Sequence, residues 1–319
     1  MLKVILVGYG ELASSLMLGV IESRHELAGV FRWEKTELND AVSFVKDIFW
    51  PDKFLSLIKA YKIPEIYAKS INSEKFKRHA LRLQPDVILV GAWGEKIKNE
   101  AIILPKIGCI NCHPSLLPAH RGSNPYASVI RLGETKTGIS FHLVDKNFDT
   151  GPILLQKEVK ILNSDTGGIL RERCAFTARK SVKELLDGLE NAMFLPRKQD
   201  ESKASYFPVI SQKDVTITWE VPAYVIYNQI RSLQPWTDCF TRYKKEFIMI
   251  KSSKIIELER PVKNPGKILS KNAEGIVVST GDPIKALLIS NLNVYGFLKV
   301  FSDMYIKNIK VGDYMEEIS

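Results

Sequence analysis

The sequence predicts an α/β domain followed by a smaller domain rich in β-strands. Over the first 150 residues, short apolar runs that suit buried strands alternate with helical segments, a pattern typical of a parallel-rich sheet. Beyond residue 205 the pattern changes to short strand-like runs divided by turn signals, as in a small β-barrel. Between the two, Leu195–Ser205 is polar and carries both signs of charge, which favours a linker.

The first domain is expected to alternate strands and helices in the following order. Strands are predicted at Lys3–Val7, His25–Phe31, Pro64–Tyr67, Asp86–Val90, Ile107–Cys112, Gly138–Val144 and Ile153–Val159. Helices are predicted at Leu12–Glu22, Pro51–Tyr61, Ser73–Leu83, Pro125–Leu132 and Thr166–Asn191. Ser73 can cap its helix, and Pro125 suits a first helical turn.

The second domain is expected to hold one helix and several short strands. The helix is predicted near Pro222–Leu233. The strands are predicted at Phe247–Lys251, Gly266–Leu269, Gly275–Ser279, Ala286–Ile289 and Gly296–Val300.

Composition is ordinary for a globular protein, with 45% hydrophobic and 25% charged residues. The net charge of +9 is spread along the chain: residues 211–319 hold 15 Lys and Arg against 12 Asp and Glu. A polyanionic partner is therefore compatible with the sequence but not required by it. No apolar run is long enough to span a membrane and no secretory signal is recognisable, so we expect a cytoplasmic protein with no membrane partner.

Four cysteines stand at positions 109, 112, 174 and 239. Cys109 and Cys112 are spaced as C-x-x-C, but a zinc site would need a second pair, and a redox pair would need a helix start after the strand. Both lie within a predicted strand. We interpret them as small buried residues of a protein from a reducing compartment.

The densest chemical signal lies at the end of the strand that leads to His113. Positions two apart in a strand point the same way, so Asn111 and His113 can face one pocket while Cys112 faces the core. Ligands of α/β sheets bind beyond the carboxyl ends of the strands. Asp149 follows 36 residues after His113, within Asn-Phe-Asp-Thr-Gly.

These residues form a pattern, N-x-H-P-S-L-L-P-x-x-R-G followed by D-T-G, that resembles the folate-dependent formyltransferases. The branch concerned includes the methionyl-tRNA and amino-sugar formyltransferases. The resemblance extends to the second domain through Trp219, Pro222-Ala223, Pro235-Trp236, Gly266-Lys267-Ile268 and Thr280-Gly281-Asp282. It implies a Rossmann-like formyltransferase domain over residues 1–194, a linker over 195–205 and an OB-like β-barrel over 206–319.

The resemblance also implies the chemistry and the residues that perform it. The co-substrate would be 10-formyltetrahydrofolate, and Asn111, His113 and Asp149 would be catalytic. An amide donor suits the oxygen that gains charge, a histidine suits the proton transfers, and a carboxylate orients and charges the imidazole. Folate would lie against Ser115, Leu116, Leu117 and Pro118 and against the backbone of Trp93, Gly94, Glu95, Lys96 and Ile97. Arg121 would contact substrate or order its loop. No metal is required, and His120 and His142 are expected to be bystanders.

The acceptor amine is less closely defined by the sequence. The second domain and the basic charge favour charged initiator tRNA. Arg32–Asp40 is nearly balanced in charge where methionyl-tRNA formyltransferases usually carry a basic insertion, which counts against tRNA. Pro114 after the histidine and the Asn-Pro-Tyr that follows resemble enzymes acting on nucleotide-linked amino sugars or other small amines. The slight preference is for methionyl-tRNA.

Two other classes of function remain as alternatives. A hydrolase could release formate from formyl-folate with the same three residues, and a non-catalytic RNA-binding protein could keep the fold alone. Dinucleotide binding is disfavoured, because Gly8-Tyr9-Gly10 lacks the third glycine of the fingerprint and Ala13 stands in its place.

Overall fold

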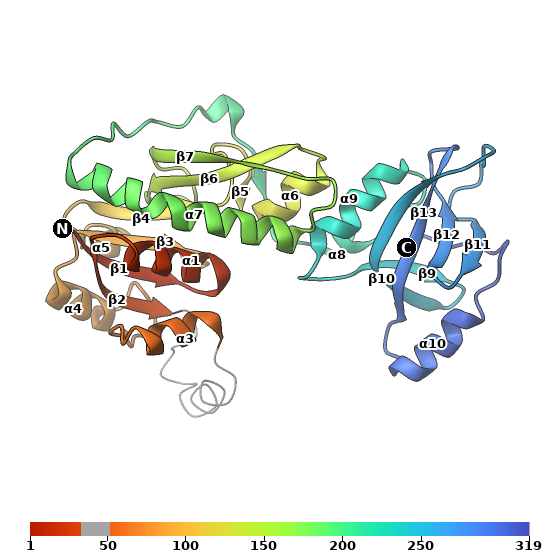
Figure 1. Cartoon of the computed structure of the whole chain (residues 1–319), viewed down its shortest axis with the longest axis horizontal. Coiled ribbons are helices and arrows are strands. Elements are labelled where there is room, and N and C mark those ends of the chain that lie inside the picture. The colour runs from red at the N-terminus through yellow and green to blue at the C-terminus, as the bar shows by residue number, and fades with distance from the viewer. Residues whose placement is uncertain (33–51, 319) are drawn as a thin grey trace. The chain divides into compact units, whose positions relative to one another are not determined.

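The chain folds into two compact units in the computed structural model, which describes residues 1–32 and 52–318 (Figure 1). Unit 1 comprises residues 1–125, 136–160 and 171–208, and unit 2 comprises residues 126–135, 161–170 and 209–319. Of the stretch Arg32–Asp40, whose charge bears on the acceptor, only Arg32 lies within the described residues.

Unit 1 is built on a six-stranded mixed sheet in the order β2-β1-β3-β4-β6-β7. The first four of these strands are parallel, whereas β6 and β7 join antiparallel. The strands are β1 Lys3–Gly8, β2 Glu26–Arg32, β3 Val87–Gly91, β4 Gly108–His113, β6 Lys136–Leu143 and β7 Ile153–Lys160. The carboxyl ends of β1, β3 and β4 therefore share one edge, as the expected Rossmann-like fold requires.

Helices cover both faces of this sheet. These helices are α1 Gly10–Ile21, α3 Lys53–Ala60, α4 Glu74–Leu83, α5 Asn99–Ile102, α6 Pro125–Arg131 and α7 Gly167–Glu190. Most of α6 and the first turn of α7 belong to unit 2. Ile5 and Ile88 share a buried cluster with Phe76 of α4 and Ala101 of α5. On the other face α1 approaches α7 so closely that a Cβ on Gly19 would lie 2.8 Å from Val182. The alternating strand faces thus support the two layers of helices.

Local signals read from the sequence are confirmed at two helix starts. The Ser73 side chain accepts a hydrogen bond from the Phe76 amide at 3.2 Å, and α6 begins at Pro125. The short strand expected at Pro64–Tyr67 is wrong: only Glu65 forms a bridge, to Val30. Proline at its start removes a ladder donor, so the segment does not continue as a strand.

Residues 195–208 run along unit 1 and contain the 3₁₀ turn η1 Glu201–Lys203 and the strand β8 Tyr206–Phe207. β8 pairs in parallel with β5, Arg121–Gly122, and Arg197 forms a bridge with Ile153. The segment expected as a linker is therefore hydrogen-bonded to the loop that follows β4 and to the start of β7.

Unit 2 holds a five-stranded antiparallel sheet in the order β11-β12-β13-β10-β9. The elements are α8 Gln212–Val215, α9 Ala223–Leu233, β9 Cys239–Tyr243, β10 Glu246–Glu257, β11 Ile268–Asn272, β12 Gly275–Ser279, β13 Lys285–Val294 and α10 Lys299–Lys307. Trp219, Ile226 and Ile230 form its core with the inward residues of the strands. The helix near 222–233 and the antiparallel sheet confirm the expected class of this domain.

Two details of that expectation are corrected. Among the described strands no ladder joins β9 to β11, so the sheet is open rather than a closed barrel. Near the C-terminus, Tyr314 forms a single bridge with Lys267, beside β11, and Glu316 forms one with Arg242 of β9. The strand expected at Gly296–Val300 is a turn that leads into α10. A short apolar run does not distinguish a strand from a helix start.

Within residues 1–32 and 52–318, we find no helix with both the length and the apolar character needed to cross a bilayer.

Candidate active site

Strands β4 and β6 together place a row of polar side chains on one face of the sheet. Asn111 is the register partner of His142, and His113 is the partner of Ser140. Side chains opposite each other on antiparallel strands share a face and lie close together. Cys112 points to the other face and is buried, as the alternation in the sequence predicted.

Asp149 reaches this row from the loop between β6 and β7. Its Oδ1 lies 3.3 Å from His113 Nδ1 and 3.3 Å from Asn111 Nδ2, and its Oδ2 accepts a hydrogen bond from the Gly122 amide at 3.2 Å. Asp149 adopts a left-handed backbone conformation with φ of 58°. Such a conformation is uncommon for a residue with a side chain, so neighbouring contacts must hold it. The structure thus brings Asn111, His113 and Asp149 together.

The contacts of His113 favour its imidazolium form. Its Nε2 donates to the His120 carbonyl oxygen at 2.8 Å, and its Nδ1 faces the Asp149 carboxylate. Both partners are acceptors, so the contacts favour a proton on each ring nitrogen. Burial opposes this charge, but the Asp149 carboxylate and the two hydrogen bonds outweigh it and raise the pKa of His113.

The Asp149 carboxylate is correspondingly held in its charged form. Burial would favour the protonated acid, but the charge of His113 and its contact with the carboxylate lower the pKa of Asp149 well below its usual range. The pair is buried, with the His113 side chain 5% and the Asp149 side chain 11% exposed.

His142, expected to be a bystander, is a direct neighbour of Asn111. Its Nδ1 donates to the Leu143 carbonyl oxygen at 2.8 Å, which leaves Nε2 to accept from Asn111 Nδ2 at 3.1 Å. His142 Nε2 also lies 3.7 Å from Asp149 Oδ1. The side-chain amide of Asn111 is therefore oriented from two sides. Sequence reasoning missed His142 because this contact depends on the register between β4 and β6.

The loop expected to contact folate is braced from β6 and β7. Ser140 Oγ donates to the Ser115 carbonyl oxygen at 2.6 Å and accepts from the Leu117 amide at 3.1 Å. Gln156 donates to the Leu117 carbonyl oxygen at 2.9 Å. Within the loop, Ser115 and Leu117 are buried, whereas Leu116 and Pro118 are half-buried. The side chains left for a ligand are thus those of Leu116 and Pro118.

The second loop expected to hold folate, Trp93–Ile97, follows β3 at the same edge of the sheet. The Glu95 carboxylate accepts from the Ser70 hydroxyl and from Asn72 Nδ2, the latter at 2.7 Å. Trp93 packs on Phe31, and Ile97 lies in the core. These side chains fix the loop, while Gly94 and Lys96 are exposed. A ligand at this loop would meet mainly backbone, in keeping with the expectation from the sequence.

Arg121 is buried and engaged with protein groups. Its Nη1 and Nη2 each donate to a carboxylate oxygen of Glu201 at 2.8 Å, and its Nη2 donates to Gln199 Oε1 at 2.7 Å. Of the two roles expected for Arg121, this geometry matches loop ordering. Substrate contact by Arg121 stays a prediction.

The cysteines are confirmed as buried free thiols. Burial raises the pKa of Cys109 to about 12, and it raises the pKa of Cys112 as well. Thiols with raised pKa values are poor nucleophiles and poor metal ligands at neutral pH.

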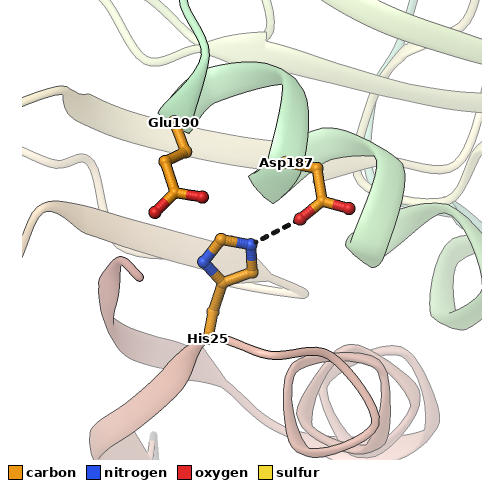
Figure 2. A group of neighbouring side chains, drawn as sticks. All are labelled: His25, Asp187 and Glu190. Atoms are coloured by element: carbon orange, nitrogen blue, oxygen red, sulfur yellow. Dashed lines mark hydrogen bonds and ion pairs between the residues drawn. The ribbon is translucent and has the colours of Figure 1, made fainter.

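One group outside this site has the composition of a metal site: His25, Asp187 and Glu190 lie with their ligand atoms within 4.8 Å of one another (Figure 2). His25 Nε2 bonds Asp187 at 3.0 Å, and its Nδ1 accepts from the Leu2 amide at 3.0 Å. Arg24 pairs with both carboxylates. Because both ring nitrogens and both acids have protein partners, the cluster serves to tie the start of β2 to the end of α7.

The fold and the clustered Asn, His and Asp define an α/β enzyme of the formyltransferase class. The family described as formyl transferase matches residues 36–186, and its C-terminal domain family matches residues 209–296. A methionyl-tRNA formyltransferase from Caldanaerobacter subterraneus subsp. tengcongensis is 31% identical over 300 residues, which cover 94% of each chain. The one from Bacillus velezensis is 29% identical over 319 residues, or 99% of this chain and 98% of the relative. The chain belongs to the formyltransferase family.

Solved structures show the same fold. The N-formyltransferase from Helicobacter canadensis, in complex with folinic acid and dTDP-3-aminofucose, superimposes with a TM-score of 0.68 at 18% identity, covering 91% of this chain and 99% of that one. HypX from Aquifex aeolicus in complex with tetrahydrofolic acid gives a TM-score of 0.65 at 16% identity and covers 98% of this chain and 50% of HypX.

Proposed function

We propose that this protein is a cytoplasmic enzyme that transfers the formyl group of 10-formyltetrahydrofolate to the amino group of methionyl-tRNA for translation initiation. The observation that carries the proposal is the contact among Asn111, His113 and Asp149 at the carboxyl end of β4, with Asp149 Oδ1 3.3 Å from each partner. The names of the relatives and their near-complete coverage support the acceptor.

In the proposed reaction the amine nitrogen forms a bond to the formyl carbon and the bond from that carbon to the folate nitrogen breaks. The proton that the amine loses balances the one that the folate nitrogen gains. The carbonyl oxygen carries negative charge in between. A buried imidazolium at His113 stabilises that charge without reorganisation, because Asp149 already holds it in place.

Asn111 is proposed as the hydrogen-bond donor to the same oxygen. Its two N–H groups are directed to His142 Nε2 at 3.1 Å and Asp149 Oδ1 at 3.3 Å. One N–H has to turn toward the oxygen as charge develops, and the longer bond to Asp149 is the easier one to exchange. His142 then keeps the amide in register during transfer.

Folate is proposed to lie between the two braced loops after β3 and β4. Leu116 and Pro118 would contact it through their half-buried side chains, and the loop 93–97 through its backbone. Ser115, Leu117, Trp93, Glu95 and Ile97 would act by shaping the loops, because their side chains are buried or braced within unit 1.

The deciding experiment offers the purified protein 10-formyltetrahydrofolate together with methionyl-tRNA or a nucleotide-linked amino sugar, in parallel. Gain of a formyl group by the methionyl amine supports the proposal, and exclusive formylation of the sugar contradicts it. Binding of tRNA should weaken steeply with salt, because phosphate contacts release counterions. An affinity that does not depend on salt would count against a tRNA acceptor.

The amino-sugar alternative rests on Pro114 and on the Asn-Pro-Tyr that begins at Asn124. The Helicobacter canadensis structure shows that this fold can carry a nucleotide-linked amino sugar in its own site. A hydrolase would release formate with no amine present, and an RNA-binding protein would keep its full biological activity after His113→Ala. These two outcomes separate the alternatives from formyl transfer.

A further inference from the structure

Residues 197–207 bind to both loops that supply the candidate active site. The Arg121 amide donates to the Ser205 carbonyl oxygen at 2.9 Å, and the His120 amide donates to Ser205 Oγ at 2.9 Å. At the other end of the segment, Arg197 and Ile153 exchange two backbone hydrogen bonds of 2.8 Å. We call residues 197–207 the strap.

Gln199 is the one buried polar side chain of the strap that touches the Asp149 turn, and it is 5% exposed. Its Nε2 donates to the carbonyl oxygen of Asp149 at 2.9 Å and to that of Gly151 at 2.8 Å. Both N–H groups of the amide are therefore used on a single turn. Its Oε1 accepts from Arg121 Nη2 at 2.7 Å, so every polar atom of the side chain has a partner.

The turn that Gln199 holds has an unfavourable backbone. Asp149 has φ of 58°, and Gly151 lies so close to β6 that a Cβ there would be 1.8 Å from the Leu143 carbonyl oxygen. Carbonyl groups in such a turn have no ladder partner, and burying them unpaired would be costly. The two hydrogen bonds from Gln199 therefore favour the one conformation in which the Asp149 carboxylate faces His113.

The orientation of Gln199 is itself determined by Arg121 and Glu201. An amide side chain could turn its oxygen toward the turn and lose both hydrogen bonds. Arg121 prevents this, because its guanidinium needs an acceptor at Oε1 and is fixed by the two-point contact with Glu201. Glu201, Arg121 and Gln199 thus form a continuous chain of contacts that ends at the backbone of Asp149.

We propose that Gln199 is a positioning residue for the transfer reaction: it holds the Asp149 turn so that the carboxylate faces His113 and Asn111, and Arg121 and Glu201 orient it. This inference rests on the proposed function for its kinetic consequences, though not for the geometry. Gln199 does not touch His113 or Asn111, so it acts only through Asp149. The strap is then part of the active site rather than a connection between domains.

The test replaces Gln199 with methionine, which keeps the length of the side chain and removes both donors together with the acceptor for Arg121. We expect kcat to fall about 10- to 100-fold, since a shift of about 1 Å at a reacting group has that effect. The KM for the formyl donor should change little, because Ser140 and Gln156 still brace the 115–118 loop. The matched control is Gln229→Met, the same change on a buried glutamine whose Nε2 donates to the Asp214 and Thr216 carbonyl oxygens of unit 2 instead of the Asp149 turn.

A readout that does not depend on turnover separates positioning from general destabilisation. The groups that act on His113 are the Asp149 carboxylate, the His120 carbonyl oxygen and Arg121. In Gln199→Met the Asp149 turn is released and Arg121 loses its Oε1 acceptor, and of these two groups Asp149 has the larger effect on the pKa of His113. Nuclear magnetic resonance titration of the His113 ring should then show its pKa falling toward the ordinary value in Gln199→Met and staying at the parental value in Gln229→Met.

The outcomes are distinguishable. A Gln199→Met protein with parental kcat and parental His113 titration overturns the positioning role, whatever the acceptor is. Lower kcat with an unchanged titration and a lower melting temperature would also overturn it, because that pattern reports loss of folded protein. A parent protein that transfers no formyl group contradicts the proposed function, while the titration still tests the role of Gln199.

Discussion

Replacing Asp149 with asparagine tests the electrostatic core of the proposed mechanism. The side chain keeps its shape and loses its charge. At 3.3 Å from His113 Nδ1 and an effective dielectric constant of about 20, the attraction that is removed amounts to about 5 kcal/mol. Part of it is offset in the parent protein by the cost of burying both charges. We therefore expect kcat to fall about 10²- to 10⁴-fold, which corresponds to about 3–5 kcal/mol of barrier.

The pH dependence of the transfer rate in the same variant is a second test of the mechanism. The pKa of His113 is raised in the folded parent, so the imidazolium and the rate persist until the pH rises through that raised value. In the profile of rate against pH, Asp149→Asn should shift the alkaline fall in rate to lower pH, because the carboxylate charge that raises the pKa of His113 is gone.

The free energy of unfolding should also depend on the charges of His113 and Asp149. The raised pKa of His113 contributes stability that is complete below about pH 6.5 and is lost as the pH rises through the folded value. The lowered pKa of Asp149 contributes stability that is present above about pH 4 and is lost as the pH falls toward the folded value. The difference in the free energy of unfolding between the parent protein and Asp149→Asn should thus be largest between about pH 4 and pH 6.5.

The assay is single-turnover formyl transfer at saturating co-substrate across this pH range, with urea unfolding at each pH. The matched control is Asp303→Asn, at an exposed position of α10. It should leave both kcat and the alkaline fall in rate unchanged. An Asp149→Asn enzyme with parental kcat, or with an alkaline fall in rate at the parental pH, would refute the assignment of His113 as the charged partner.

Three further predictions follow from single contacts. Gly151→Ala should abolish transfer without unfolding the protein in circular dichroism melts, because a Cβ there would lie 1.8 Å from the Leu143 carbonyl oxygen and must displace the turn. Trp219→Phe should lower the free energy of unfolding of unit 2 by about 1–3 kcal/mol in urea, because it removes the 2.9 Å bond from the indole to Thr241 and leaves a buried group less well satisfied. Cys112→Ala should retain parental transfer and metal content, because its thiol is buried and its raised pKa keeps it protonated; loss of transfer would revive a redox or metal role.

The features that could be predicted from the sequence are those with short-range signals. The alternation along residues 108–113 placed Asn111 and His113 on one face and Cys112 on the other, because strand geometry has a period of two. The cap at Ser73 and the start of α6 at Pro125 were visible for the same reason, since each depends on one residue and its immediate neighbours.

The errors occurred where tertiary contacts decide between local alternatives. The run Gly296–Val300 suits a strand, but Ser302 and Ile309 lie buried beside the sheet at a spacing that fits a helix and the turn after it. The strand β9 was missed because Cys239–Tyr243 has a weak apolar pattern and pairs with β10 through a tight turn at Lys244. His142 was missed because its role depends on the register between β4 and β6, which no local pattern specifies.

The same distinction applies within the active site. Asn111 and His113 are two positions apart in the chain, whereas a group that fixes Asp149 comes from far away in sequence: Gln199 lies 50 residues beyond it. Ordering such distant segments costs conformational entropy, which is recovered only once the whole unit has folded. A substitution in the strap can therefore lower the rate of transfer without touching any group that meets the substrate. The polar composition of residues 195–205, which in the sequence resembles a linker, is explained by this function: each of Gln199, Glu201 and Ser205 binds a polar group of a catalytic loop.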